Sequence, residues 1–204
     1  MIRAFVFDIC DTLVRTAGVK ALLQLPGLPA GHSPASLQRW FVEEPLFYAY
    51  EKGEVSSAVF LERMLSGLKL ETDKASLEQA YECLIVEEIA GVPEIIADLK
   101  GRYGLYALSN NNPLLWQGIQ RISPTITFFD DLFLSHEIGL LKPDPKAFDY
   151  VLERLGYAAA EVMLVDDNPT CVKQARVLGW QALQFNNAAD LNLQLQRYGI
   201  CKSV

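Results

Sequence analysis

The chain has 204 residues, of which 50% are hydrophobic and 21% are charged, and its formal net charge is −7. This composition is typical of a globular protein with a substantial core, and it excludes a disordered chain, which would contain fewer apolar residues and more charge of one sign. The excess of acidic residues argues against a broad basic surface, so we expect no nucleic-acid partner.

The first predicted element is a strand over residues 1–7, which is apolar at nearly every position. Continuous hydrophobicity is typical of a parallel strand that is covered on both faces. The polar stretch Asp8-Ile9-Cys10-Asp11-Thr12 follows directly. Because open α/β sheets bind ligands at the carboxyl ends of their strands, we expect this stretch to belong to a site.

The stretch from residue 15 to residue 91 has a different pattern. It predicts helices over residues 34–50, 56–66 and 75–90, separated by Gly and Pro and without clear strands. We interpret residues 15–91 as a helical insert between the first strand and the rest of the sheet.

The remaining sequence returns to strands that end in polar residues. Residues 105–108 precede Ser109-Asn110-Asn111-Asn112, and residues 162–165 precede Asp166-Asp167-Asn168-Pro169. Further elements are predicted as helices over 147–155, 169–178 and 187–198 and a strand over 180–185. This alternation predicts an α/β fold with a doubly wound parallel sheet, in which residues 1–14 and 92–204 form the core.

Oxygen-bearing side chains would converge at the carboxyl edge of this sheet. Asp8, Asp166 and Asp167 are hard oxygen ligands, which favour Mg²⁺. Ser109 and the amides after it could donate to an anion, and Lys142 would add a point charge for a phosphate. Each residue alone is more often a turn or helix-cap residue than a site residue. The order of these segments and their common position at strand ends are what indicate a site.

Four segments in this order closely resemble the motifs of the haloacid-dehalogenase-like (HAD) superfamily of hydrolases. They are Phe-Asp-Ile-Cys-Asp-Thr-Leu (7–13), Leu-Ser-Asn (108–110), Gly-Leu-Leu-Lys-Pro-Asp-Pro (139–145) and Val-Asp-Asp-Asn-Pro (165–169). Tyr50-Glu51-Lys52-Gly53-Glu54-Val55-Ser56 also resembles the helical cap of the branch that contains sugar-phosphate phosphatases and the N-terminal domains of soluble epoxide hydrolases. The resemblance implies a Rossmann-like core with a small inserted helical cap.

The resemblance also implies the site residues and their roles. Asp8 would attack phosphorus and form an aspartyl-phosphate, while Ser109, Asn110 and Lys142 would bind the phosphoryl group. Mg²⁺ would be held by Asp8, the backbone carbonyl of Cys10 and Asp167, with Asp166 as an alternative ligand. The implied function is magnesium-dependent hydrolysis of a small phosphorylated metabolite. From the insert, Arg39, Trp40, Tyr48 and Tyr50 could face the cleft and select that substrate, although aromatic residues at helical spacing more often belong to a core.

Two positions depart from the family pattern. Phosphatases of this superfamily usually carry an aspartate as general acid two residues after the nucleophile, where this chain has Cys10. A thiol is a poor replacement for a carboxylic acid, and the loss would lower the rate by about 10²–10⁴. Asp11 is one step along the chain and would point away. Cys171 stands where a second acid or Asn often supports the metal.

These departures leave two other functions open. A catalytically weak or inactive member could bind a ligand or a protein without turnover. A 2-haloacid dehalogenase would use Asp8 without metal and needs no acid at position 10, although such enzymes usually carry a tyrosine there. Release of phosphate, of halide or of neither distinguishes the three functions.

The sequence further predicts a cytoplasmic protein without a membrane partner. Its N-terminus lacks a basic segment followed by an apolar stretch, and its apolar runs are too short to span a bilayer. The widely spaced cysteines Cys10, Cys83, Cys171 and Cys201 indicate free thiols. Nothing in the sequence indicates the oligomeric state.

Overall fold

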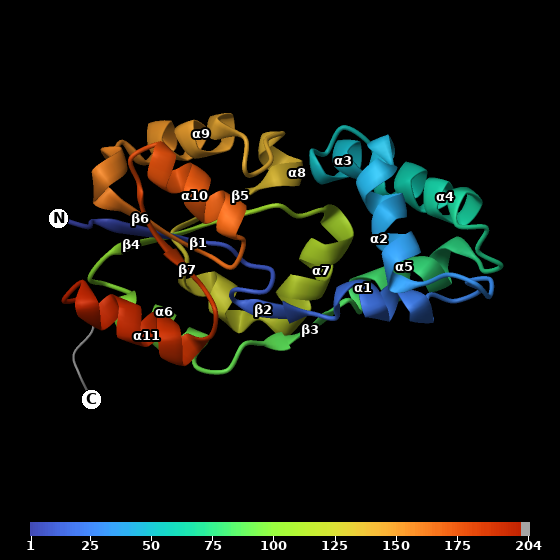
Figure 1. The fold of residues 1–204 in the computed structure, drawn as a ribbon, viewed down its shortest axis with the longest axis horizontal. Coiled ribbons are helices and arrows are strands. Elements are labelled where there is room, and N and C mark those ends of the chain that lie inside the picture. Colours follow the sequence, from blue (N-terminus) through green and yellow to red (C-terminus); the bar gives the residue numbers. More distant parts are fainter. Residues whose placement is uncertain (201–204) are drawn as a thin grey trace.

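The computed structural model describes residues 1–200, and within them a five-stranded parallel sheet has the order β5-β4-β1-β6-β7 (Figure 1). Its strands are β1 (Ala4–Phe7), β4 (Gly104–Ser109), β5 (Asp131–Leu134), β6 (Val162–Asp166) and β7 (Gln181–Gln184). The chain adds strands first on one side of β1 and then on the other. This arrangement confirms the predicted doubly wound parallel sheet.

Helices cover both faces of this sheet. The helices α6 (Val92–Leu99), α7 (Pro113–Ile122) and α11 (Ala188–Arg197) pack on one face, and α9 (Pro145–Leu155) and α10 (Pro169–Val177) pack on the other (Figure 1). The short helix α8 (Ser135–Ile138) follows β5, and single 3₁₀ turns occupy Pro124–Phe128 and Ala159–Glu161. No helix among the described residues has the length and apolar character of a membrane span.

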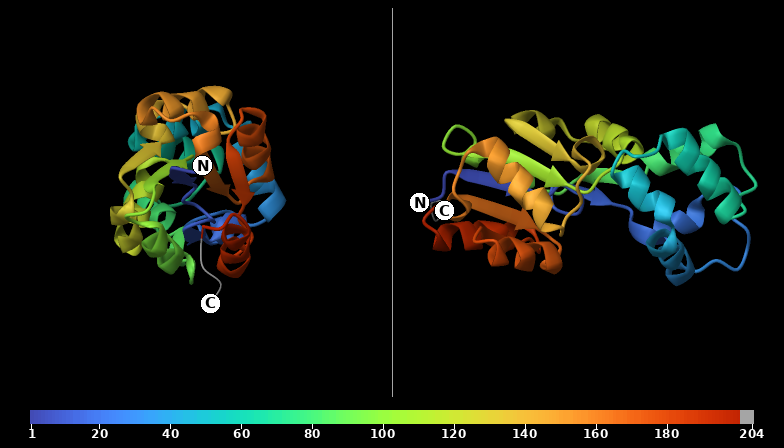
Figure 2. Two further views of the ribbon diagram at one scale, coloured as in Figure 1. Left: turned by 90° about the vertical axis from the view of Figure 1, so that its left-hand side faces the viewer. Right: turned by 90° about the horizontal axis from the view of Figure 1, so that it is seen from above.

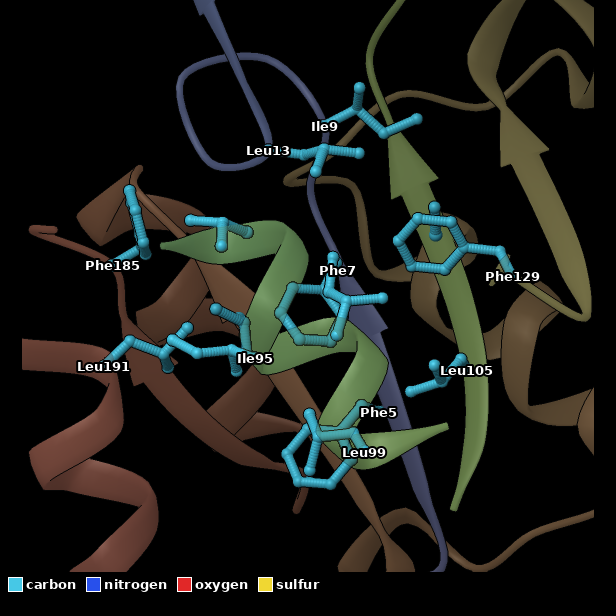
Figure 3. Close-up of a cluster of buried hydrophobic side chains, with 14 of the residues drawn as sticks. Phe5, Phe7, Ile9, Leu13, Ile95, Leu99, Leu105, Phe129, Phe185 and Leu191 are labelled. Carbon is cyan, nitrogen blue, oxygen red and sulfur yellow. The ribbon is translucent and has the colours of Figure 1, made fainter. Parts of the chain in front are cut away.

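The position of β1 at the centre of the sheet explains why its sequence is apolar throughout, because helices cover both of its faces. Phe5 and Phe7 point into the cluster with α6 and α11 (Figure 3). Ala4 and Val6 belong to the cluster with α9 and α10 on the other face of the sheet. All four residues are fully buried. Burying a side chain such as Phe contributes roughly 1.5–3 kcal/mol. The buried strand therefore fixes the position of Asp8, the residue that follows it.

Residues 18–82 form a separate group of helices, here called the helical segment. Its elements are α1 (Gly18–Ala21), a 3₁₀ turn (Leu22–Gln24), α2 (Pro34–Glu43), α3 (Pro45–Glu51), α4 (Ser57–Gly67) and α5 (Lys74–Glu82). These helices enclose their own hydrophobic cluster, which includes Leu37, Phe60 and Leu77. Figure 2 shows that the helical segment lies beyond the carboxyl ends of the strands.

The structure corrects two details of the predicted helices. The helix predicted over residues 34–50 is two helices, because Pro45 cannot donate a backbone hydrogen bond and disfavours helical geometry at Glu44, where φ is −85° and ψ is 108°. The helix predicted over residues 75–90 ends at Glu82. It is followed by β3 (Ile85–Glu88), which pairs antiparallel with β2 (Val14–Thr16), so the prediction that residues 15–91 lack strands is wrong.

Candidate active site

Asp8 follows β1 directly and is 8% exposed. Its Oδ1 accepts a hydrogen bond from the backbone N–H of Ile9 at 2.7 Å and lies 3.1 Å from the Nζ of Lys142. Burial raises the pKa of the Asp8 carboxyl, and the Lys142 ammonium opposes this effect. No partner is bound to the other oxygen, Oδ2, within residues 1–200. A carboxylate held through one oxygen has its second oxygen available for nucleophilic attack.

Lys142 lies buried between two carboxylates. Its Nζ is 2.6 Å from Asp166 Oδ2 and 3.1 Å from Asp8 Oδ1. Burial alone would lower the pKa of Lys142, but these two anions outweigh burial and raise the pKa above its usual range. The side-chain amide of Asn110 fixes the Lys142 backbone, because Asn110 Nδ2 donates to the Lys142 carbonyl and Asn110 Oδ1 accepts from the Lys142 N–H, both at 2.8 Å. Asn110 therefore connects the end of β4 to the lysine loop.

The adjacent acids Asp166 and Asp167 have different environments. Asp166 is fully buried, and its two oxygens accept hydrogen bonds from Lys142 Nζ and from the N–H of Asn168 at 2.8 Å. The partly exposed Asp167 carboxylate accepts no hydrogen bond within residues 1–200, although its backbone N–H donates to Thr12 Oγ1 at 3.2 Å. Burial and the charge of Asp166 raise the pKa of Asp167. Asp167 is therefore the acid of the pair that is available to a metal.

Oxygen atoms of Asp8, Asp166 and Asp167 lie within 4.8 Å of one another. The Cys10 carbonyl, in the loop after Asp8, accepts no backbone hydrogen bond within the described chain. Mg²⁺ is bound by one or two carboxylates together with waters and phosphate oxygens. The donor set therefore fits magnesium.

Ser109 ends β4 and is fully buried, yet its Oγ has no hydrogen-bond partner among residues 1–200. Buried hydroxyl groups are nearly always hydrogen-bonded, so this orphan donor indicates a ligand position. Hydrogen bonds hold the loop that follows Ser109. Ser135 Oγ accepts from the Asn111 N–H at 2.8 Å and donates to the Asn111 carbonyl at 2.9 Å, and Asn112 caps α7 through the N–H of Leu115.

Two of these supporting residues, Thr12 and Ser135, were not predicted as site residues from the sequence. Thr12 orients the backbone of Asp167, and Ser135 supports the loop after Ser109. Thr12 lies within the quoted first motif, which was a usable signal. Ser135 carries no signal, because a single serine after a strand is ordinary loop chemistry.

Asp11 and the two residues that depart from the family pattern, Cys10 and Cys171, are unsuited to general-acid catalysis. The Asp11 carboxylate accepts two hydrogen bonds from Thr16, at the end of β2, one from the backbone N–H at 2.9 Å and one from Oγ1 at 2.7 Å. Burial and the neighbouring carboxylates of Asp8 and Asp11 raise the pKa of Cys10 above its usual range. Cys10 is therefore a neutral thiol, as is Cys171, whose pKa is also raised by burial.

A pocket of about 350 Å³ opens beside Cys10, between the sheet edge and the helical segment. Its lining is largely apolar and consists of Cys10, Thr16, Gly18, Val19, Leu22, Gln38, Phe41, Val42, Phe47, Tyr48, Glu51, Tyr81, Leu84, Asn110 and Leu115. A larger hollow between α6 and α11 contains none of the candidate site residues.

The candidate substrate-selecting residues are only partly in this pocket. Tyr48 lines it, whereas Arg39, Trp40 and Tyr50 do not. Tyr50 is fully buried, with its hydroxyl bound to Ser57 and to the N–H of Leu114, and Trp40 packs close to Gly67. The interpretation of Tyr50 as a cleft residue is therefore wrong.

Comparison with known proteins identifies the family. A family model for haloacid dehalogenase-like hydrolases matches residues 2–179, so the chain belongs to this family and is a hydrolase. It is 27% identical over 203 residues to the D-ribitol-5-phosphate phosphatase of Bacteroides thetaiotaomicron, covering 96% of this chain and 97% of that one.

Two further comparisons agree with this assignment. The chain is 26% identical over 202 residues to flavin mononucleotide hydrolase 1 of Arabidopsis thaliana, covering 97% of this chain and 78% of that one. Its fold matches a HAD family enzyme of Bacteroides thetaiotaomicron, crystallised with magnesium and inorganic phosphate, with a TM-score of 0.79 at 20% identity, covering 92% and 96% of the two chains.

Proposed function

We propose that this protein is a magnesium-dependent phosphatase that hydrolyses a small phosphate monoester through an aspartyl-phosphate on Asp8. The observation that carries the proposal is the grouping of Asp8, the uncommitted carboxylate of Asp167 and the unpartnered hydroxyl of Ser109 at one sheet edge. One relative is named a D-ribitol-5-phosphate phosphatase and another a flavin mononucleotide hydrolase, and both names state a phosphorylated small molecule as the substrate. A related fold was crystallised with magnesium and phosphate.

In this proposal each residue has a defined task. The free Oδ2 of Asp8 attacks phosphorus, and the bond from phosphorus to the leaving-group oxygen breaks. Ser109 donates a hydrogen bond to a phosphoryl oxygen, and Lys142 keeps Asp8 ionised while it balances the phosphate charge. Asp8, Asp167 and the Cys10 carbonyl would hold Mg²⁺, which reduces the repulsion between Asp8 and the substrate.

We further propose that the helical segment acts as the cap of this site. Its helices lie over the carboxyl ends of the strands, and residues from α2, α3 and α5 line the pocket together with Cys10 and Asn110. A cap in this place would exclude water and choose the leaving group. The apolar lining favours substrates whose leaving group carries a hydrophobic or aromatic portion.

Substitution of the nucleophile tests the reaction. Asp8→Asn should lower phosphate release from p-nitrophenyl phosphate by at least about 10³-fold, because an amide cannot form the acyl-phosphate bond. The control Asp149→Asn, at an exposed position on α9, should match the parent. Turnover by Asp8→Asn near the parental rate would exclude the covalent mechanism. Full activity in excess chelator would exclude magnesium, and release of halide from a 2-haloacid would favour a dehalogenase.

A further inference from the structure

The proposed reaction needs a proton for the leaving group. An alkoxide is a poor leaving group, and a positioned acid accelerates its departure by about 10²–10⁴-fold. In this chain the Cys10 thiol stands at the usual place of the acid, and the Asp11 carboxylate is bound to Thr16. Neither residue supplies an acidic proton to the pocket.

Glu51 is a lining residue of that pocket and carries a carboxyl group. It is the last residue of α3, and it lines the pocket together with Cys10 and Asn110. Among the described residues that line the pocket, Glu51 is the only carboxylic acid. Its carboxyl group has no hydrogen-bond or ion-pair partner within residues 1–200, in contrast to Glu44 at the other end of α3, which accepts from Arg63 at 2.6 Å.

Contacts on both sides of Glu51 fix its position relative to the site. The hydroxyl of the preceding residue, Tyr50, accepts a hydrogen bond from the N–H of Leu114 at 3.2 Å, at the start of α7. Gly53 lies directly against α8, because a Cβ atom added there would collide with the carbonyl oxygen of His136. The end of α3 is thus held by the segments that follow β4 and β5, the two strands that lead to Ser109 and to the Lys142 loop.

We propose that Glu51 is the general acid of this enzyme and donates the leaving-group proton that the residue at position 10 cannot supply. This inference rests on the proposed phosphatase function. As Asp8 Oδ2 bonds to phosphorus, the bond from phosphorus to the ester oxygen breaks and that oxygen takes the Glu51 proton, so an alcohol leaves. The Glu51 carboxylate then accepts a proton from the water that attacks the aspartyl-phosphate, and inorganic phosphate is released with Glu51 protonated again.

The environment of Glu51 keeps a proton available near neutral pH. Burial raises the pKa of its carboxyl to about 7, and the C-terminus of a helix also disfavours a negative charge. The other titratable groups that line the pocket are Cys10, Tyr48 and Tyr81, and burial raises the pKa of Cys10 and of Tyr81. Proton donation should therefore be available below about pH 7 and be lost above it.

Two esters of similar size separate proton donation from binding. Both p-nitrophenyl phosphate and benzyl phosphate carry one aromatic ring, but only benzyl phosphate releases a strongly basic alkoxide unless it is protonated. Glu51→Gln should lower kcat/KM for benzyl phosphate by about 10²-fold and for p-nitrophenyl phosphate by only a few fold. The parent should lose benzyl phosphate activity above about pH 7, where Glu51 loses its proton, and Glu51→Gln should remove this pH dependence.

Two further variants complete the experiment. Cys10→Asp added to Glu51→Gln should restore benzyl phosphate hydrolysis, because it returns an acid to the site. Glu54→Gln makes the same chemical change at an exposed position of the same turn and should match the parent. An equal loss on both esters, or no loss on either, would overturn the role of Glu51. If the parent releases phosphate from neither ester, or Asp8→Asn retains activity, the proposed function fails and this inference with it.

Discussion

The position of Lys142 decides how the three acids of the site divide their tasks. Its ammonium neutralises Asp166 at 2.6 Å and Asp8 at 3.1 Å, so two buried carboxylates share one cation. Both oxygens of Asp166 are therefore occupied, because the second oxygen accepts a hydrogen bond from the N–H of Asn168. Asp167 has no such bond in the described chain and remains free for a metal.

This division predicts different effects of two similar substitutions. Asp167→Asn should raise the magnesium concentration needed for half-maximal activity more than about 10-fold, with little change in stability, because it weakens only a metal ligand. Asp166→Asn should lower the free energy of unfolding by about 3–5 kcal/mol, because it breaks a buried ion pair. Magnesium titration of phosphate release and denaturant unfolding measure the two effects. A larger shift in the magnesium requirement for Asp166→Asn would reverse the assignment.

The candidate residues that the sequence indicated are those with a fixed place at strand ends. Asp8, Ser109 and Asp166 each end or directly follow a buried strand, and the order of the motifs supplied the rest. Glu51 could not be found in this way. The proposed role of Glu51 depends on the packing of α3 against α7 and α8, which are distant in sequence. It also depends on the absence of a partner for the Glu51 carboxyl within residues 1–200.

The elements show the same contrast between local and distant causes. The N-cap residue of α10 was predicted from the sequence, and the structure confirms it: Asn168 Oδ1 accepts a hydrogen bond from the Thr170 N–H at 2.9 Å. The strand β3 was not predicted from the sequence. It forms by pairing with β2, about 70 residues away in the sequence, and the strand preference of a segment depends on the strand that it pairs with. The helices α6 and α7 and the strand β5 were also not predicted.

The turn after α3 provides a test of how closely the helical segment must approach the core. Gly53 has φ +71°, and a side chain there would collide with the His136 carbonyl. Gly156 has φ +67° at the end of α9, with open space around it. Substitution of either by Ala should cost about 1 kcal/mol of backbone strain, measured by denaturant unfolding. Gly53→Ala should cost more than Gly156→Ala, because its Cβ also collides with the His136 carbonyl. Gly53→Ala should in addition lower kcat/KM by about 10-fold or more, because it displaces the end of α3.

Equal kinetics for the two Ala variants would show that the approach of α3 to α8 does not matter for turnover. The comparison is matched, because both glycines have nearly the same left-handed geometry and both are exposed. Only the neighbouring carbonyl differs.

At the scale of the whole molecule, the protein has two hydrophobic bodies that meet at α7. The sheet and its helices enclose two clusters, and the helical segment encloses a third. Leu114, at the start of α7, is fully buried in the cluster of the helical segment, whereas Ile119, further along the same helix, is fully buried in the sheet cluster. One helix therefore contributes to both bodies and connects them.

This arrangement predicts that two truncations on one helix have similar effects on stability and different effects on activity. Leu114→Ala and Ile119→Ala should each lower the free energy of unfolding by about 2–5 kcal/mol, because each leaves a cavity in a packed cluster. Leu114→Ala should also lower kcat/KM by about 10-fold or more, because it loosens the contact that holds the helical segment over the site. Ile119→Ala should keep kcat/KM near the parental value at temperatures where it is folded. Denaturant unfolding and steady-state phosphate release on the same preparations measure both quantities. An equal loss of kcat/KM in the two variants would mean that general loosening of α7 controls turnover, and that the seating of the helical segment does not.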